Sequence, residues 1–115
     1  MNRGDVCWAD LKPRSGAEQS GRRPVVVISN DGFNRIPAWR SVIVVPLSTS
    51  ESQARRGPSA ILLEPPATGL ESESVALCHQ VTTLDRTKLG RRVGTLDTAA
   101  LCELEAGLKA AMDLR

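Results

Sequence analysis

Apolar residues are spaced along the chain as they are in a small sheet protein. Residues 5–9 and 74–81 alternate between apolar and polar side chains, which is the period of a strand. Residues 24–29 and 41–47 are continuous runs rich in valine and isoleucine, typical of strands covered on both faces. Together with the short apolar segment 60–63, the pattern predicts about five strands.

The C-terminal segment follows the period of a helix instead. Leu101, Leu104, Leu108 and Met112 are spaced by three or four residues and so fall on one helical face. Asp97 stands where an N-cap is expected, because its carboxylate can accept hydrogen bonds from the first backbone N–H groups of a helix. We expect this helix to pack its apolar face against the sheet.

Polar segments with glycine and proline separate these elements. Residues 12–22 and 48–58 are typical of long loops, residues 30–32 of a turn, and residues 85–89 of a single helical turn. Connections of this length, without a crossover helix, favour antiparallel neighbours. The expected fold class is therefore mainly β (α+β): a small barrel-like antiparallel sheet of about five strands with a packed C-terminal helix, in one domain spanning residues 1–115.

The composition is that of an ordinary globular chain of 115 residues, with 41% hydrophobic and 24% charged residues. No apolar run approaches the ~18 residues that cross a bilayer, and the N-terminus has no apolar signal core. We therefore expect a cytoplasmic protein without a membrane segment. Cys7, Cys78 and Cys102 lack metal-site spacing, so we expect buried thiols and no bound metal or cofactor.

The positive charge is unevenly placed. The net charge is only +2, but residues 97–115 hold four acidic and two basic residues, which leaves a net +4 on the rest of the chain. Many of these cations lie in polar stretches, in three groups at residues 12–23, 55–56 and 91–92. Exposed arginine pairs are often only a solvated surface, yet three groups in one small domain favour a polyanionic partner.

Six sequence blocks, taken in order, resemble those of one family. They are Arg3-Gly4-Asp5-Val6, Gly16-Ala17-Glu18-Gln19, Gly21-Arg22-Arg23-Pro24 with the valine run after it, Val45-Pro46-Leu47-Ser48-Thr49-Ser50, Leu77-Cys78-His79-Gln80-Val81-Thr82-Thr83, and Gly94-Thr95-Leu96. Each block alone is weakly specific. The ordered set covers nearly the full length of the chain and resembles the MazF/PemK toxins.

The resemblance implies an SH3-like barrel, usually a homodimer, that cuts single-stranded RNA at short sequences without a metal. It also implies a type II toxin–antitoxin pair, in which a cognate MazE-like antitoxin lays a disordered tail over the RNA groove. RNA can be cut without a metal because its own 2′-hydroxyl lies beside the scissile phosphate. The expected products are a 2′,3′-cyclic phosphate and a 5′-hydroxyl, and DNA should resist.

Two positions match catalytic positions of that family. Arg23 matches its principal arginine, whose forked donors suit phosphate oxygens and whose high basicity makes it a poor general base, so we expect transition-state stabilisation. Ser48 falls where members usually carry threonine, and either hydroxyl can bond a phosphate oxygen. Thr49, next to it, can share or replace that role. Without the resemblance, both hydroxyls are ordinary strand-end groups.

The general base has two candidates. Glu18 aligns with an acidic residue thought important in some members. His79 stands where the family generally has aspartate or glutamate, and imidazole, with an ordinary pKa near ~6.5, is the better base at neutral pH. A lone histidine in a strand is as often structural. This departure also leaves base preference open, because the adjacent Gln80 is expected to read RNA edges.

The other expected RNA contacts are cationic or polar loop residues. They are Lys12, Arg14, Gln19, Arg55 and Arg56. Trp39 can stack on a base, although core or partner packing suits it better, and Trp8 is expected in the core.

Two other functions use the same scaffold. A gyrase poison of the CcdB type shares the fold but acts by binding, and its characteristic C-terminal end contains tryptophan, which residues 111–115 lack. A degenerate relative that binds RNA or an antitoxin without cutting is the third possibility, suggested by His79.

Overall fold

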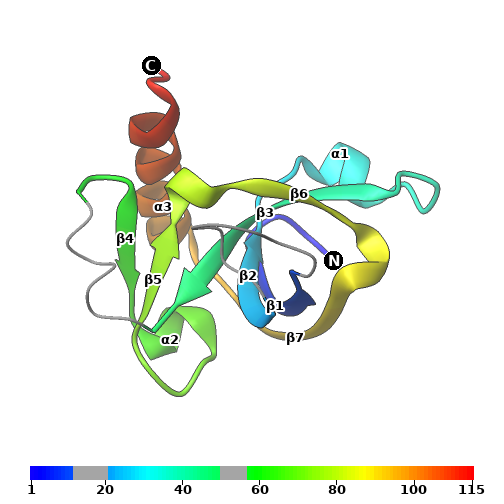
Figure 1. The fold of residues 1–115 in the computed structure, drawn as a ribbon, viewed down its shortest axis with the longest axis horizontal. Coiled ribbons are helices and arrows are strands. Elements are labelled where there is room, and N and C mark those ends of the chain that lie inside the picture. Colours follow the sequence, from blue (N-terminus) through cyan, green and yellow to red (C-terminus); the bar gives the residue numbers. More distant parts are fainter. Residues whose placement is uncertain (12–20, 50–56) are drawn as a thin grey trace.

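The computed structural model describes residues 1–11, 21–49 and 57–115 (Figure 1). Its strands are β1 (Asp5–Asp10), β2 (Arg22–Val27), β3 (Ser41–Ser48), β4 (Ala60–Leu63), β5 (Ser74–Leu77), β6 (Thr82–Asp85) and β7 (Leu89–Thr95). Its helices are α1 (Asp31–Asn34), α2 (Pro65–Thr68) and α3 (Thr98–Met112), with two 3-10 turns, η2 (Cys78–Gln80) and η3 (Arg86–Lys88). Within these residues, no helix is both long and apolar enough to cross a bilayer.

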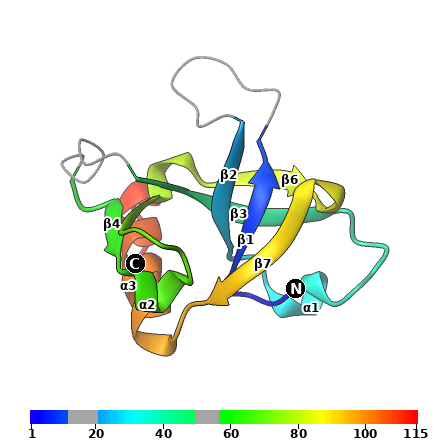
Figure 2. The same cartoon turned by 90° about the horizontal axis from the view of Figure 1, so that it is seen from below.

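One antiparallel sheet organises the molecule, with β3 at its centre. The strand order is β4-β5-β3-β2-β1-β7, and β6 pairs with the first half of β3. At its other end β3 leaves β6, and Leu47 and Ser48 pair with β5. The sheet curves strongly between these partners, and α3 and α1 lie at opposite ends of the molecule in both views (Figures 1 and 2). This is the barrel-like fold class that the sequence predicts.

Two apolar clusters lie on opposite faces of the central strands. Val26 and Val45 belong to the cluster beneath α3, whereas Val25, Val27 and Val44 belong to the cluster on the other face. All five are fully buried. Alternate residues of β2 therefore enter different clusters, which confirms that the continuous valine run marks a strand covered on both faces.

The C-terminal helix begins where the sequence predicts. The Asp97 carboxylate accepts a hydrogen bond from Ala100 N–H at 2.8 Å, and such N-caps contribute about 1 kcal/mol to helix stability. Leu104 and Leu108 are buried against the sheet, but Met112 is 46% exposed. The predicted apolar face is thus correct for the middle of the helix and wrong at Met112, whereas Ala111 beside it packs against the core.

The first sequence block is structural in the described chain. Arg3 donates to the Ile28 carbonyl at 3.0 Å and to Glu105 of α3 at 2.8 Å. The buried Asp5 carboxylate accepts from Asn2 N–H at 2.8 Å and from the Thr95 hydroxyl at 2.9 Å. These contacts tie the start of β1 to β2, β7 and α3.

Several predicted elements differ from the structure. The sheet has seven strands among the described residues rather than about five, because β6 and β7 were not predicted. The strand predicted over residues 74–81 ends at Leu77 and continues as η2, and all four residues of β5 are buried rather than alternating. The predicted turn at residues 30–32 opens the short helix α1. The predicted helical turn at residues 85–89 is confirmed as η3.

Candidate functional site: a cationic groove across the sheet

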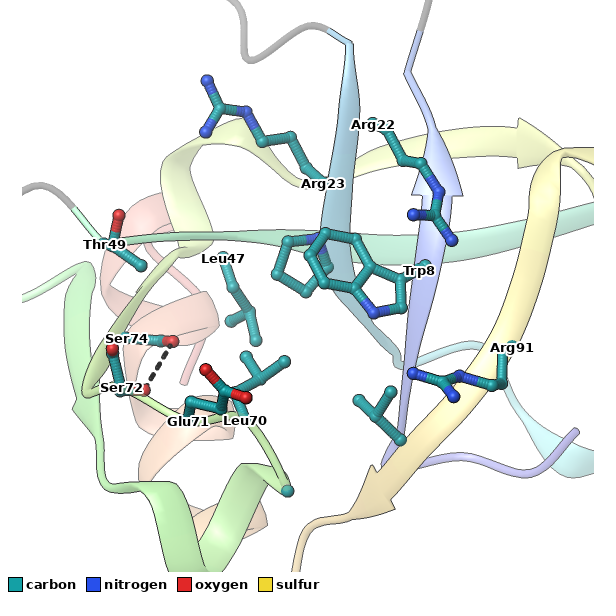
Figure 3. A pocket seen from close by; sticks show the side chains of 13 residues that line it. Trp8, Arg22, Arg23, Leu47, Thr49, Leu70, Glu71, Ser72, Ser74 and Arg91 are labelled. Atoms are coloured by element: carbon teal, nitrogen blue, oxygen red, sulfur yellow. Dashed lines mark hydrogen bonds between the residues drawn. The ribbon is translucent and has the colours of Figure 1, made fainter.

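A groove of about 580 Å³ lies beside the second half of β1 and the first half of β2 (Figure 3). Segments far apart in the sequence line it: β1, β2, the end of β3, the α2–β5 connection and β7. The lining residues are Trp8, Arg22, Arg23, Pro24, Leu47, Thr49, Gly69, Leu70, Glu71, Ser72, Ser74, Arg91 and Val93. This volume lies within the usual range for ligand sites.

Strand register explains which side chains face the groove. Trp8 of β1 pairs with Pro24 of β2, so the two residues share a face of the sheet. Leu47 and Thr49 of the β3 end alternate with buried Ser48 and both line the groove. The period of two residues therefore directs Thr49, rather than Ser48, toward this space.

Trp8 and Arg22 form the wall on the β1 side. The Arg22 guanidinium lies 4.9 Å from the centroid of the Trp8 ring, which is within cation–π range. The prediction that Trp8 belongs to the core is wrong, because its side chain is only partly buried and lines the groove. An aromatic ring paired with a guanidinium offers a flat surface on which a base can stack.

The catalytic candidates Arg23 and Ser48 come from neighbouring strand ends. The pairing of β2 with β3 extends to Val25 and Pro46, which lie two residues from Arg23 and from Ser48 respectively. Arg23 is exposed and lines the groove, whereas Ser48 is only 7% exposed and does not. In Figure 3 the Arg23 guanidinium extends away from Trp8, on the side of the groove that carries Thr49. The arginine and the Thr49 hydroxyl thus share one accessible space.

The opposite wall is the α2–β5 connection, and a glycine contact fixes it. Gly69 has φ +78° and lies so close to β7 that a Cβ there would come within 2.1 Å of the Val93 carbonyl oxygen. Buried Thr68 accepts a hydrogen bond from Leu70 N–H at 3.1 Å. This wall places Leu70 and Glu71 at the groove, and Figure 3 shows the Glu71 carboxylate turned toward the side that Leu47 lines.

Charge in the groove is mainly positive. Arg22, Arg23 and Arg91 line it together with one carboxylate, Glu71. Arg91 extends from β7 toward the groove from the side opposite the α2–β5 connection (Figure 3). Three guanidiniums around a partly apolar groove suit a ligand that carries both phosphates and planar apolar groups.

His79 and Gln80 lie in a different hollow. Both are in η2 and line a space of about 230 Å³ with Ser59, Ala60 and Leu77. His79 is exposed there, and this hollow and the groove have no described lining residue in common. Arg23 and Thr49 therefore line one groove, whereas His79 lines another hollow.

Cys7 and Cys78 are unsuited to nucleophilic chemistry. Burial raises the pKa of the Cys78 thiol to about 11, and burial, with the nearby Asp5 charge, also raises the pKa of Cys7. A raised pKa keeps both as neutral thiols at neutral pH. Cys102, predicted to be buried, is exposed on α3. Among the described residues, no three His, Cys, Asp or Glu side chains are grouped as metal ligands would be.

Several predicted site residues lie outside the described residues, and the groove contains others that were not predicted. Those outside are Glu18, Lys12, Arg14, Gln19, Arg55 and Arg56. Those missed are Trp8, Arg22, Arg91 and Glu71. The sequence showed the arginines only as charged pairs, and it held no signal that the connection carrying Glu71 would fold back onto β7. Trp39, exposed by 45% and stacked on Phe33 at 4.6 Å, is not in the core.

Comparison with known sequences identifies a single family. A family model described as PemK-like, MazF-like toxin of type II toxin–antitoxin system matches residues 2–112. The chain is 35% identical over 116 residues to Endoribonuclease MazF9 of Mycobacterium tuberculosis, covering 99% of this chain and 98% of that protein. It is 33% identical over 114 residues to Endoribonuclease EndoA of Bacillus subtilis, with 99% and 96% coverage.

Solved structures show the same fold. MazF from Deinococcus radiodurans superposes with a TM-score of 0.79 at 23% identity, covering 99% of this chain and 97% of that one. A mycobacterial endoribonuclease, solved in complex with its cognate antitoxin, superposes with a TM-score of 0.78 at 25% identity, covering 100% and 97%.

Proposed function

The chain belongs to the PemK-like, MazF-like toxins of type II toxin–antitoxin systems, and we propose that it is an endoribonuclease whose groove cuts single-stranded RNA at specific sequences without a metal. The observation that carries the proposal is the meeting of Arg23 and the hydroxyl-bearing end of β3 at one cationic groove. Its relatives in M. tuberculosis and B. subtilis are named endoribonucleases, which supports the same activity.

The chemistry is transfer of the phosphodiester to the neighbouring ribose hydroxyl. The 2′-oxygen forms a bond to phosphorus as the bond to the 5′-oxygen breaks, which leaves a 2′,3′-cyclic phosphate and a 5′-hydroxyl end. Arg23 donates to the non-bridging oxygens, whose negative charge grows in the crowded phosphorane. The hydroxyl of Thr49, or of Ser48, bonds the same phosphate.

Two proton transfers complete the reaction. The 2′-hydroxyl proton passes to a general base, and the departing 5′-oxygen takes a proton from Arg23 or from water. Glu18 and His79 remain the candidates for the base. The position of His79 in a separate hollow favours Glu18, which precedes Arg23 by only five residues in the chain.

The proposal includes the protein's partners. A cognate antitoxin holds the toxin inactive, as suggested by the mycobacterial endoribonuclease solved with its antitoxin. The proposal also includes assembly of the protein as a homodimer in the cytoplasm. Exposed Leu62, Met112 and Leu114, on β4 and at the C-terminal end of α3, offer apolar surface for a second copy.

The test is cleavage of a long RNA by the purified protein in excess chelator, with the ends mapped. We expect discrete cuts that carry cyclic phosphate ends, and no cut where the nucleotide before the scissile bond is replaced by its 2′-deoxy form. Binding without cleavage identifies a non-catalytic relative. Gyrase-dependent DNA damage with intact RNA identifies a gyrase poison. Either result, or activity only when metal is restored, contradicts the proposal.

A further inference from the structure

The Glu71 carboxylate is the acidic group of the groove, and the cleavage chemistry does not use it. It faces a space in which Arg22, Arg23 and Arg91 supply positive charge. An RNA strand lying here sets its phosphates against the guanidiniums, and a carboxylate repels phosphate at short range. Whatever Glu71 meets in bound RNA is therefore a hydrogen-bond donor, and the donors of a nucleotide other than its hydroxyls are the N–H groups of its base.

The remaining lining of the groove suits a base. Pro24, Leu47 and Val93 supply apolar surface, and the Trp8 ring with Arg22 over it supplies a flat one. Base stacking on such a wall contributes affinity without depending on which base is present. Sequence preference therefore has to come from the polar group that meets the edge of the base.

A carboxylate distinguishes among the four bases by geometry. Its two oxygens accept two parallel hydrogen bonds most favourably, as they do from an arginine fork. The Watson–Crick edge of guanine offers two adjacent N–H donors, at N1 and N2. Adenine and cytosine place a lone pair beside their amino group, and uracil flanks its single N–H with carbonyls. Unpaired lone pairs against a carboxylate are unfavourable.

The position of Glu71 is defined by the fold. Its neighbour Leu70 is held by the Thr68 hydroxyl at 3.1 Å, and Gly69 lies against the Val93 carbonyl of β7. The carboxylate thus extends from a fixed wall opposite the Trp8 side of the groove, as Figure 3 shows. An acceptor carried on an anchored backbone and facing a stacking wall is an arrangement that can read one base.

We propose that the groove binds a guanine base of the RNA, with its N1–H and N2–H donating to Glu71 and its ring against Trp8 and Arg22. The inference rests on the proposed RNA cleavage and names the specificity of that site.

The first experiment combines one change in the protein with one change in the RNA, each alone and both together. Cut sites are mapped to find a guanine that they share, and this guanine is replaced by inosine, which lacks the N2 amino group. For the wild-type protein we expect kcat/KM to fall about 10- to 100-fold, the loss expected for one hydrogen bond to a charged group. For Glu71→Gln, kcat/KM on the guanine substrate should fall by a similar factor. Replacing guanine with inosine should then lower the kcat/KM of this variant little further.

Glu73→Gln is the matched control. Glu73 is an exposed acid two residues further along the same connection, it does not line the groove, and interaction with the Glu64 carboxyl raises its pKa. This variant should behave as the wild-type protein does with both substrates. The proposal is overturned if Glu71→Gln and inosine lower kcat/KM independently, so that their fold-losses multiply when combined. Cut sites that share no guanine also overturn it. So does a fall in kcat alone that is equal for all sequences, which indicates proton transfer instead.

A second measurement does not require cleavage. In a Trp39→Phe background Trp8 is the remaining tryptophan, and its fluorescence reports on the groove. Guanosine monophosphate should quench it with a Kd at least tenfold lower than that of inosine or adenosine monophosphate. Glu71→Gln should remove this difference in Kd. Equal binding of the three nucleotides overturns the inference. If the preference is present but long RNA stays intact, the proposed function fails and the base site stands.

Discussion

The groove and the His79 hollow both lie where strands of the sheet end, yet they differ in charge. The groove gathers three arginines and a threonine hydroxyl in about 580 Å³. The hollow, of about 230 Å³, has no arginine or lysine among its described lining residues. Phosphodiester cleavage requires cations against the charge that develops on phosphorus oxygens. Of the two places with candidate chemistry, the groove is the one that supplies them.

The two sites also differ in how the chain builds them. The hollow consists of two short segments, residues 59–60 and 77–80, which the pairing of β4 with β5 brings together. The groove needs five segments, and the strand order sets β1, β2 and β3 side by side with β7 at the edge. A site made of many distant segments depends on the whole fold, whereas a site made of one hairpin does not.

The sharpest way to test this comparison is to remove one side chain from each place. Arg23→Ala should lower kcat about 10³-fold, the loss typical of removing one donor that stabilises a developing oxyanion. His79→Ala should change kcat less than about threefold, because the hollow is separate from the groove. Single-turnover cleavage of a mapped oligonucleotide measures both.

Arg35→Ala is the control for loss of charge alone. Arg35 is the C-cap residue of α1, is exposed by 71%, does not line the groove and pairs with Asp31 at 3.7 Å. Its removal should leave cleavage unchanged, and all three variants should keep the thermal stability of the parent protein. A His79→Ala variant that loses activity together with the acidic limb of the pH profile shows that His79 is the base after all.

The local patterns in the sequence were sufficient to predict most of the strands and the last helix. The valines of both runs are fully buried, and Asp97 caps the last helix through its own side chain. β7 was missed because its sequence, LGRRVGT, is exposed or half-buried along its length and contains two glycines. It is a strand because β1 pairs with it, and that is a property of the fold rather than of the segment.

The same distinction applies to the site. Arg23 was predicted because it matches a family motif in its own segment. Trp8 was misplaced because an aromatic residue in an alternating strand looks the same whether a core or a groove lies beside it. The contribution of Glu71 depends on a backbone contact between Gly69 and Val93, residues 24 positions apart, and no local pattern encodes that contact.

The groove wall should be more sensitive to substitution than an open turn of equal backbone geometry. Gly69 and Gly21 both have φ +78°, but a Cβ at Gly69 meets the Val93 carbonyl oxygen at 2.1 Å, and one at Gly21 meets no described atom within 4 Å. The left-handed conformation alone costs alanine about 1 kcal/mol. Overpacking adds about 2 kcal/mol at Gly69.

Thermal unfolding measures the difference. At about 4 °C per kcal/mol for a domain of this size, Gly69→Ala should lower Tm by about 12 °C and Gly21→Ala by about 4 °C. If the two variants unfold at the same temperature, the contact between the α2–β5 connection and β7 does not hold the wall, and the position assigned to Glu71 loses its support.

The smallest expected effect separates the two hydroxyls at the end of β3. Thr49→Val keeps the shape of the side chain and should lower kcat/KM about 10-fold through loss of one hydrogen bond to phosphate, with unchanged stability. Ser48→Ala should instead cost about 1 kcal/mol of stability, because its hydroxyl is buried, and should cut RNA at nearly the parent rate. Thr49→Ser keeps the hydroxyl and should therefore cut RNA at nearly the parent rate. The reverse pattern assigns the phosphate contact to Ser48, as the family resemblance implies, and requires that end of β3 to open when RNA binds.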